Sequence, residues 1–346
     1  MHELVILLSD FYVSQETPDR ELPAGVTLPG MQQAARFGSR ERLPDGWRGW
    51  LSRWLNGGES GAPATVAAAS LLRAPRSTIA TTAHAWLATP MHLIAGLTSI
   101  HVDRRSILRL DAADQAALAA DFQRVFHDSG FHLRPLDAGD FLMLGPQMPV
   151  AATLEPARFM GASMGDAQRG GAANPALLRL GAEIEMWLYD HPVNEGRRRR
   201  GEPPVTALWL WGGGDVATHR ERTSATPHLP DIAFGRDSYL QGLWAGRGAK
   251  VAPLPEQLTD VFGYPQAQRA VLLIEIGVML QSNSTWTIFD ALAQIDRSFI
   301  VPAIEALKQG RCERLVIIAN DNKLTLRARD RLKIWRRTPR GLSGLQ

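Results

Sequence analysis

"QRAVLLIEIGVMLQSNSTWTIFDALAQIDRSFIVPAIEALKQGRCERLVIIAN", residues 268–320, contains the pattern that decides the fold class. Two short runs, 268–276 and 313–320, are apolar at nearly every position, which is typical of strands covered on both faces. Between them lies an amphipathic stretch of helical period that Pro302 interrupts and Gly310 ends. Strand, helix and strand in this order favour an α/β fold.

The N-terminal region adds further elements to this expected core. Leu4–Leu8 form a third apolar run, and Gly46–Leu55 form an amphipathic stretch that carries tryptophans. A loop of small residues at 56–65 leads into an Ala-rich segment that we expect to be helical.

Residues 84–145 have the composition of a compact α+β unit. The stretch 91–102 predicts a pair of strands, and 131–144 predicts a hairpin. Asp111 is a suitable N-cap for an Ala-rich helix that ends near Phe126.

The densest stretch is "HPVNEGRRRRGEPPVTALWLWGGGD", residues 191–215. It follows a helix that Pro175 opens and Pro192 stops. The run 205–211 is apolar on both sides, so we expect it to be a central strand. Filling of the core is the favoured role of its tryptophans, Trp209 and Trp211, and lining a pocket is the alternative.

Three glycines, Gly212, Gly213 and Gly214, come next. In a loop after a strand, their backbone N–H groups could border a bound anion. Simple turn chemistry is the alternative, since neither the Walker pattern nor GxGxxG is present.

Polar side chains of the same block are candidates for an anion-binding site. Arg197 is the candidate for contacting the anion, with His191 and Asn194 to position it. The alternative is that His191 and Asn194 cap the end of the preceding helix, and that the arginine run is a solvated charged face.

Two carboxylates follow apolar strands, Asp10 and Asp321. Ligand sites of α/β folds form at the carboxyl ends of strands, so these residues could share one divalent cation, magnesium or manganese. Capping of helices or turns is the alternative. The sequence contains no HExxH, CxxC or GxSxG pattern, so it gives no support to a zinc site or a hydrolase elbow.

Bulk composition excludes several classes of protein. The net charge of +3 is too small to imply nucleic-acid binding, and no apolar run is long enough for a membrane span. The N-terminus lacks the basic region of a signal peptide, and one cysteine fits a reducing compartment. We therefore expect a cytoplasmic protein with neither a nucleic-acid nor a membrane partner.

Residues 183–214 resemble a motif of a bacterial family of RpfE-type regulatory proteins, which is related to cofactor-independent, archaeal-type phosphoglycerate mutases. The matching positions are Glu183, His191, Pro192, Asn194, Arg197, Gly201, Pro203, Trp209, Trp211, Gly212 and Gly214. Thr206 stands where the family usually has Asn. Weaker agreement extends over most of the chain.

The resemblance implies an alkaline-phosphatase-like α/β core, with a mostly parallel sheet covered by helices, and a smaller inserted α+β domain. Residues 1–75 and 200–346 would form the core. Residues 76–199 would form the inserted domain and a linking helix.

Active mutases of this superfamily use two divalent metals and a serine nucleophile. Asp10 matches their first-strand Asp, but Asp321-Asn322 stands where an Asp-His pair belongs, and no histidine follows residue 228. Ser52 and Ser60 are only formal candidates for the nucleophile.

The resemblance therefore implies a non-catalytic regulatory protein, with no cofactor or with one divalent cation. Its ligand would be a phosphate ester, another anionic small molecule or a protein partner. One alternative is a metal-dependent phosphomutase or phosphatase with a reduced site at Asp10, Asp321 and Glu275. A third reading makes the 191–214 block a purely structural junction.

Overall fold

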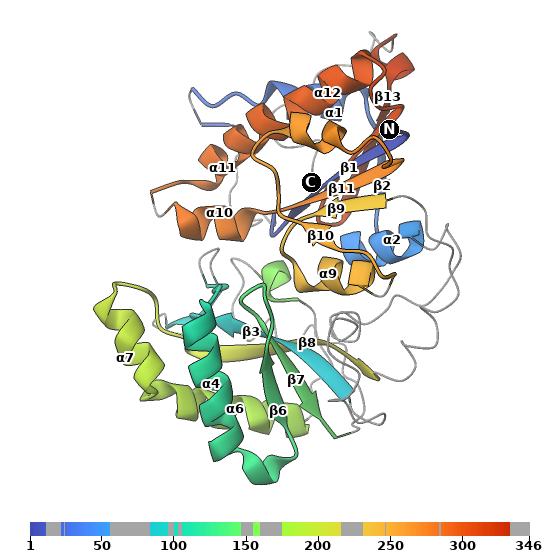
Figure 1. The fold of residues 1–346 in the computed structure, drawn as a ribbon. Coiled ribbons are helices and arrows are strands. Elements are labelled where there is room, and N and C mark those ends of the chain that lie inside the picture. Colours follow the sequence, from blue (N-terminus) through green and yellow to red (C-terminus); the bar gives the residue numbers. More distant parts are fainter. Residues whose placement is uncertain are drawn as a thin grey trace.

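The computed structural model describes residues 1–11, 22–23, 25–55, 84–95, 100–102, 106–146, 155–159, 175–215, 231–245, 247–283 and 285–332. The expected loop at 56–65, the Ala-rich segment after it and Ser60 lie outside these ranges. The described chain forms two lobes (Figure 1). We call residues 1–55 and 231–332 the core lobe and residues 84–215 the second lobe.

A seven-stranded sheet forms the centre of the core lobe, as far as the described residues extend. Its strands are, in spatial order, β10 (Val251–Ala252), β9 (Asp231–Phe234), β11 (Arg269–Glu275), β1 (Glu3–Ser9), β12 (Arg314–Ala319), β13 (Asn322–Arg327) and β2 (Ser39–Arg42). The strands from β10 to β12 run parallel, and β13 and β2 run antiparallel. The prediction of an α/β core with a mostly parallel sheet is confirmed.

Helices cover both faces of this sheet (Figure 1). One face carries α1 (Pro29–Phe37), α10 (Ile276–Ser282), α11 (Ile288–Ile295) and α12 (Val301–Lys308), and the other carries α2 (Gly46–Leu55) and α9 (Ser238–Ala245). Strand β1 shows the consequence for the sequence. Leu4, Ile6 and Leu8 pack into the first apolar cluster, whereas Val5 and Leu7 pack into the second. Since both faces of the strand are covered, its middle positions, Leu4–Leu8, are all apolar.

The helical stretch before β12 contains the predicted interruption. Helix α11 is followed by a π-helical turn, Asp296–Ile300, and then by α12. Pro302 has no N–H to donate to the preceding turn, which accounts for the wider turn at this point. Gly310, with φ of 74°, follows the end of α12 as expected.

The second lobe is an antiparallel sheet packed against helices. Its strand order is β6 (His132–Pro135), β7 (Phe141–Gly145), β3 (His84–Met91) and β8 (Ala207–Asp215). The helices are α4 (Ala112–Val125), α6 (Pro175–Tyr189) and α7 (Pro192–Arg199), and β4 (Ile94–Ala95) pairs with β5 (Ile100–His101). Short helical turns are η2 (His127–Ser129), η3 (Pro156–Phe159), η4 (Leu258–Gly263) and η6 (Ala328–Leu332). The predicted strand pair, hairpin and Asp111 cap are confirmed.

The prediction that 205–211 forms a central strand of the core is wrong. Strand β8 lies at the edge of the smaller sheet, where it pairs with β3 alone among the described strands. An apolar run indicates burial but does not select a partner strand, which explains the error. The division into domains with a boundary at residue 200 remains a prediction. That boundary would assign β8 to the core, whereas β8 pairs with β3 of the second lobe.

The three glycines are part of strand β8, not of a loop after it. Gly212 has φ of +63°, and the pairing with β3 shifts its register between Ala85 and Leu87. A Cβ on Gly213 would collide with the indole ring of Trp86, which is fully buried. The absence of a side chain at 213 therefore permits the close packing of β8 on β3.

Gly213→Ala should destabilise the protein by about 1–3 kcal/mol, because the buried Trp86 has no room to move away. Gly181→Ala is the matched control. Position 181 lies inside helix α6 with no atom within 4 Å of an added Cβ, so alanine should stabilise by about 0.5–1 kcal/mol. Urea unfolding measures both changes. Equal effects would contradict the packing argument.

Candidate functional site between the two lobes

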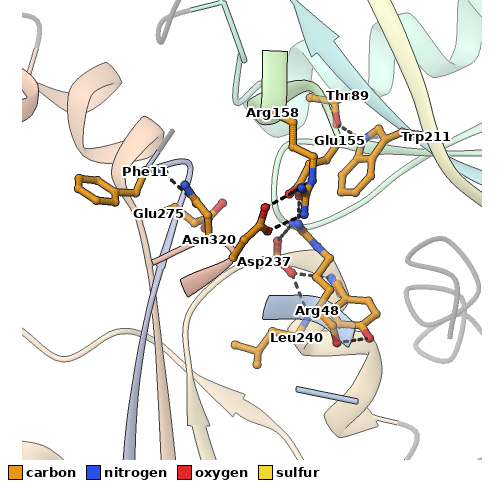
Figure 2. Close-up of polar contacts among 12 residues, drawn as sticks. Phe11, Arg48, Thr89, Glu155, Arg158, Trp211, Asp237, Leu240, Glu275 and Asn320 are labelled. Atoms are coloured by element: carbon orange, nitrogen blue, oxygen red, sulfur yellow. Dashed lines mark hydrogen bonds and ion pairs between the residues drawn. The ribbon is translucent and has the colours of Figure 1, made fainter. Parts of the chain in front are cut away.

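The carboxyl ends of the parallel strands face the second lobe, and acidic residues gather there. Asp10 follows β1, Glu275 is the last residue of β11, and Asp237 precedes α9 just after β9. In open parallel sheets, ligands bind outside this edge. The gap between the lobes is therefore the candidate functional site (Figures 1 and 2).

A small cavity lies at this place, with a volume of about 20 Å³, enough for roughly one water molecule. The described residues that line it are Asp10, Arg48, Leu87, Thr89, Ile107, Arg109, Asp140, Glu155, Pro156, Ala157, Trp211, Asp237 and Ser238. Both lobes contribute to this wall. Trp211 is buried in the second lobe, donates from Nε1 to Thr89 Oγ1 at 2.8 Å, and also lines the cavity. Trp211 is therefore both a core and a cavity residue.

Arg109 joins carboxylates of both lobes. Its Nη1 lies 2.9 Å from Asp140 Oδ1 in the second lobe, and its Nη2 lies 2.9 Å from Glu275 Oε1 in the core lobe. The backbone reinforces this junction, because Arg109 N donates to Gln281 Oε1 at 3.2 Å. Gln281, on α10, also donates to the carbonyl of Ile107.

Two more arginines cross between the lobes (Figure 2). Arg48, on α2, forms an ion pair with Glu155 of the second lobe and another with Asp237 at 3.2 Å. Arg158 makes a bidentate pair with Asp321, at 2.8 and 2.7 Å. Bidentate guanidinium–carboxylate pairs are directional as well as strong, so these contacts fix the lobes relative to each other.

Burial shifts the titration of the carboxyl groups in this seam. Desolvation raises the pKa of Asp10 and of Asp140, and the guanidinium of Arg109 offsets only part of this effect. Desolvation likewise raises the pKa of Glu275, to about 7. The pKa values rise because a carboxylate charge is poorly solvated at this depth.

Two polar side chains of the cavity lack a hydrogen-bond partner among the described residues. Ser238 Oγ, at the first turn of α9, is buried and makes no hydrogen bond with them. Asp10 makes no hydrogen bond or ion pair within the described part of the chain, and its backbone has a left-handed φ of 60°. Its neighbour Asp237 is used structurally, since Oδ1 accepts from the N–H groups of Tyr239 and Leu240 at 2.9 and 3.0 Å.

The structure places the two predicted metal ligands in different surroundings. Asp10 lines the cavity, whereas Asp321 is held by Arg158 and does not line it. Among the described residues, no group of three or more His, Cys, Asp or Glu side chains is arranged to hold a metal ion. Whether the protein binds a divalent cation remains a prediction.

The polar residues of the 191–214 block make contacts inside the second lobe. His191 caps α7, where its Nδ1 accepts from Val193 N at 3.1 Å. Asn194 Nδ2 donates to the carbonyls of Leu188 and Val205, each at 2.7 Å, and Oδ1 accepts from Val205 N at 2.7 Å. The amide of Asn194 therefore ties the end of α6 to the start of β8.

Arg197 is buried as well. Its Nε donates to Pro203 O at 2.9 Å, and its Nη1 lies 3.0 Å from Asp114 Oδ2 on α4. Neither Arg197 nor the other predicted ligand residues of the block are among the described residues that line the cavity. These contacts support the structural alternative for the block, and a ligand role for it remains a prediction.

Of the residues that line the cavity, sequence reasoning named Asp10 and Trp211 and missed most of the others. Glu275, which it also named, pairs with the cavity residue Arg109. Arg48, Arg109 and Ser238 were not among its candidates. Only the last carried a usable signal, because "DIAFGRDSYL", residues 231–240, reads as a strand followed by an Asp-capped helix. The arginines come from distant segments, and nothing local marks them.

Comparison with known proteins gives similarity at the level of solved structures only. No protein-family model matches the chain, and no curated protein matches it either. A cofactor-independent phosphoglycerate mutase from Thermoplasma acidophilum is 14% identical, with 94% of this chain and 89% of that chain covered and a TM-score of 0.41. The PH0037 protein of Pyrococcus horikoshii is 12% identical, with 94% and 87% covered and a TM-score of 0.43. Both are distant likenesses of fold.

The lengths and hydropathies of the helices bear on the expectation that the protein has no membrane partner. No helix in the described part of the chain is long and apolar enough to cross a bilayer.

Arg197→Ala should lower the free energy of unfolding by roughly 2 kcal/mol, because Asp114 would lose one partner of a buried ion pair and keep only Arg200. Arg199→Ala is the control, since Arg199 is exposed and, among the described residues, pairs only with Glu195 on the same helix. Denaturant unfolding compares the two variants. A stable Arg197→Ala variant would remove the structural account of this residue.

The raised pKa values also predict how stability depends on pH. Between about pH 4.5 and 7 the native protein holds a proton on Glu275 that the unfolded chain has released. The free energy of unfolding should therefore fall as the pH rises through this window, by on the order of 1 kcal/mol. Glu275→Gln should flatten this slope, while Glu256→Gln, at an exposed position, should retain it. Urea titrations from pH 5 to 8 test the sign.

Proposed function

We propose that this protein is a non-catalytic regulatory protein of phosphoglycerate-mutase-like build, and that it binds a small anionic ligand, such as a phosphate ester, between its lobes. The observation that carries the proposal is the set of arginines at the strand ends. Arg109 engages Glu275, and Arg158 engages Asp321. These are the positions at which a reduced metal site would need free carboxylates.

An arginine that forms an ion pair with a carboxylate neutralises its charge, as a bound metal cation would. The guanidinium offsets the carboxylate charge and occupies its lone pairs with directed N–H groups. A carboxylate in such a pair must give up these bonds before it can coordinate magnesium or manganese. Charge compensation by the protein itself therefore supports a lost, not a reduced, metal centre.

Arg48 supports an anionic ligand. Arg48 lines the cavity, and its buried Nε has no acceptor among the residues that the structure describes. Guanidinium groups bind phosphate and carboxylate in a bidentate manner, so a ligand anion can replace Glu155 at Arg48. Because the Arg48–Glu155 pair joins the lobes, this exchange changes how firmly they are held together.

Coupling of ligand binding to the lobe contact is the basis of the regulatory role. A ligand shifts an equilibrium between two arrangements only through contacts that differ between them. Here the differing contact is the Arg48–Glu155 pair, which the anion breaks. Lobe separation would then report ligand occupancy to a partner.

Ethyl phosphate should bind to the metal-free protein, and Arg48→Lys should weaken this binding by about tenfold, because lysine keeps the charge but loses the bidentate fork. Arg199→Lys, on the exposed face of α7, is the matched control. Calorimetry in EDTA measures the affinities.

Metal analysis tests the non-catalytic part of the proposal. The purified protein should contain less than one equivalent of manganese, and added manganese should produce no phosphatase or mutase activity. Two tightly bound equivalents with metal-dependent activity would establish the alternative, a phosphomutase or phosphatase with an atypical site.

A further inference from the structure

Two side chains that line the interlobe cavity make no hydrogen bond or ion pair within the described part of the chain. Ser238 is only 4% exposed, and its Oγ has no hydrogen-bond partner there. Asp10 lines the same cavity, and no other described side chain pairs with its carboxylate. A buried polar group without a partner costs free energy, so both groups are suited to a ligand that supplies the missing bonds.

The charge balance of the cavity indicates the sign of this ligand group. Four carboxylates and two guanidiniums line it, namely Asp10, Asp140, Glu155 and Asp237 against Arg48 and Arg109. The other three carboxylates are already paired with these arginines. Asp10 makes no ion pair with a described residue, and the charges of Arg109 and Arg48 act on it only through space. A positive group that donates hydrogen bonds directly would complete its surroundings.

The size of the cavity and the hydrogen-bond donors that it requires limit which positive group can bind there. The cavity holds roughly one water-sized group, and the side chains of Leu87, Ile107 and Trp211 form part of its wall. A protonated primary amine has about this size and brings three N–H donors that need only nearby acceptors. A divalent cation needs several ligands at fixed geometry, and the described acidic side chains form no such group.

We propose that Asp10 and Ser238 bind the protonated primary amino group of the ligand. Resting on the proposed function, this makes the ligand a zwitterion, an amine-bearing phosphate ester or related anion. Its ammonium group occupies the water-sized space between Asp10 and Ser238, and its anionic group takes the place of the Glu155 carboxylate at Arg48. The carboxylate of Asp10 supplies the charge, and the hydroxyl of Ser238 accepts one N–H bond.

Matched ligands test the amine directly. Phosphoethanolamine and ethyl phosphate differ by the amino group alone, and phosphocholine carries a quaternary amine that is too bulky and donates no hydrogen bond. By calorimetry with EDTA, phosphoethanolamine should bind about ten- to a hundredfold more tightly than ethyl phosphate. Phosphocholine should show no such gain.

Two variants test whether Asp10 and Ser238 cause the tighter binding of phosphoethanolamine. Asp10→Asn keeps the shape but removes the charge, so it should abolish most of the preference for phosphoethanolamine while ethyl phosphate still binds. Ser238→Ala should reduce the preference severalfold, and it removes no hydrogen bond of the protein. Asp260→Asn, at an exposed position of the core lobe, should leave the preference intact.

The outcomes separate this inference from the proposed function. Equal binding of phosphoethanolamine and ethyl phosphate, or a preference that survives in Asp10→Asn, would overturn the amine site and leave an anion-binding protein. Binding of neither compound would overturn both. A preference that appears only with manganese would assign Asp10 to a metal instead.

Discussion

The contact of Arg109 with Asp140 and Glu275 is the interaction on which the interlobe region depends. One guanidinium serves a carboxylate of each lobe at a depth where an unpaired charge is poorly solvated. The pKa of Glu275 is raised by burial even with this partner in place. The ion pairs of Arg109 therefore affect both how the lobes are held together and how readily the buried acids ionise.

At the strand ends of the core lobe, arginines neutralise the carboxylates of Glu275 and Asp321. The carboxyl ends of parallel strands usually offer free groups to a ligand. Here Arg109 and Arg158 reach from the second lobe and occupy the carboxylates of Glu275 and Asp321. Among the described residues, the side chains of Asp10 and Ser238 have no hydrogen-bond partner in the same small cavity, although arginine–carboxylate pairs join the lobes around it.

The helices and strands were easier to predict from the sequence than the residues of the interlobe cavity. Strand β1 and helix α4 could be predicted because their signals, a continuous apolar run and an Asp cap, are local. Asp10 was found by the rule for strand ends. Arg48 and Arg109 could not be found this way, because each acquires its role from carboxylates more than a hundred residues away in the chain, Glu155 and Glu275.

The sequence by itself determined strands such as β1, β11 and β12 and helices such as α4, and that their apolar faces require an α/β core. Only the tertiary structure decided that β8 joins the smaller sheet and that Arg197 is bound to Asp114. The physical reason is the range of the forces. Backbone conformation and periodic burial depend on neighbours within a few positions, whereas strand pairing and charge compensation depend on groups brought together by the whole fold.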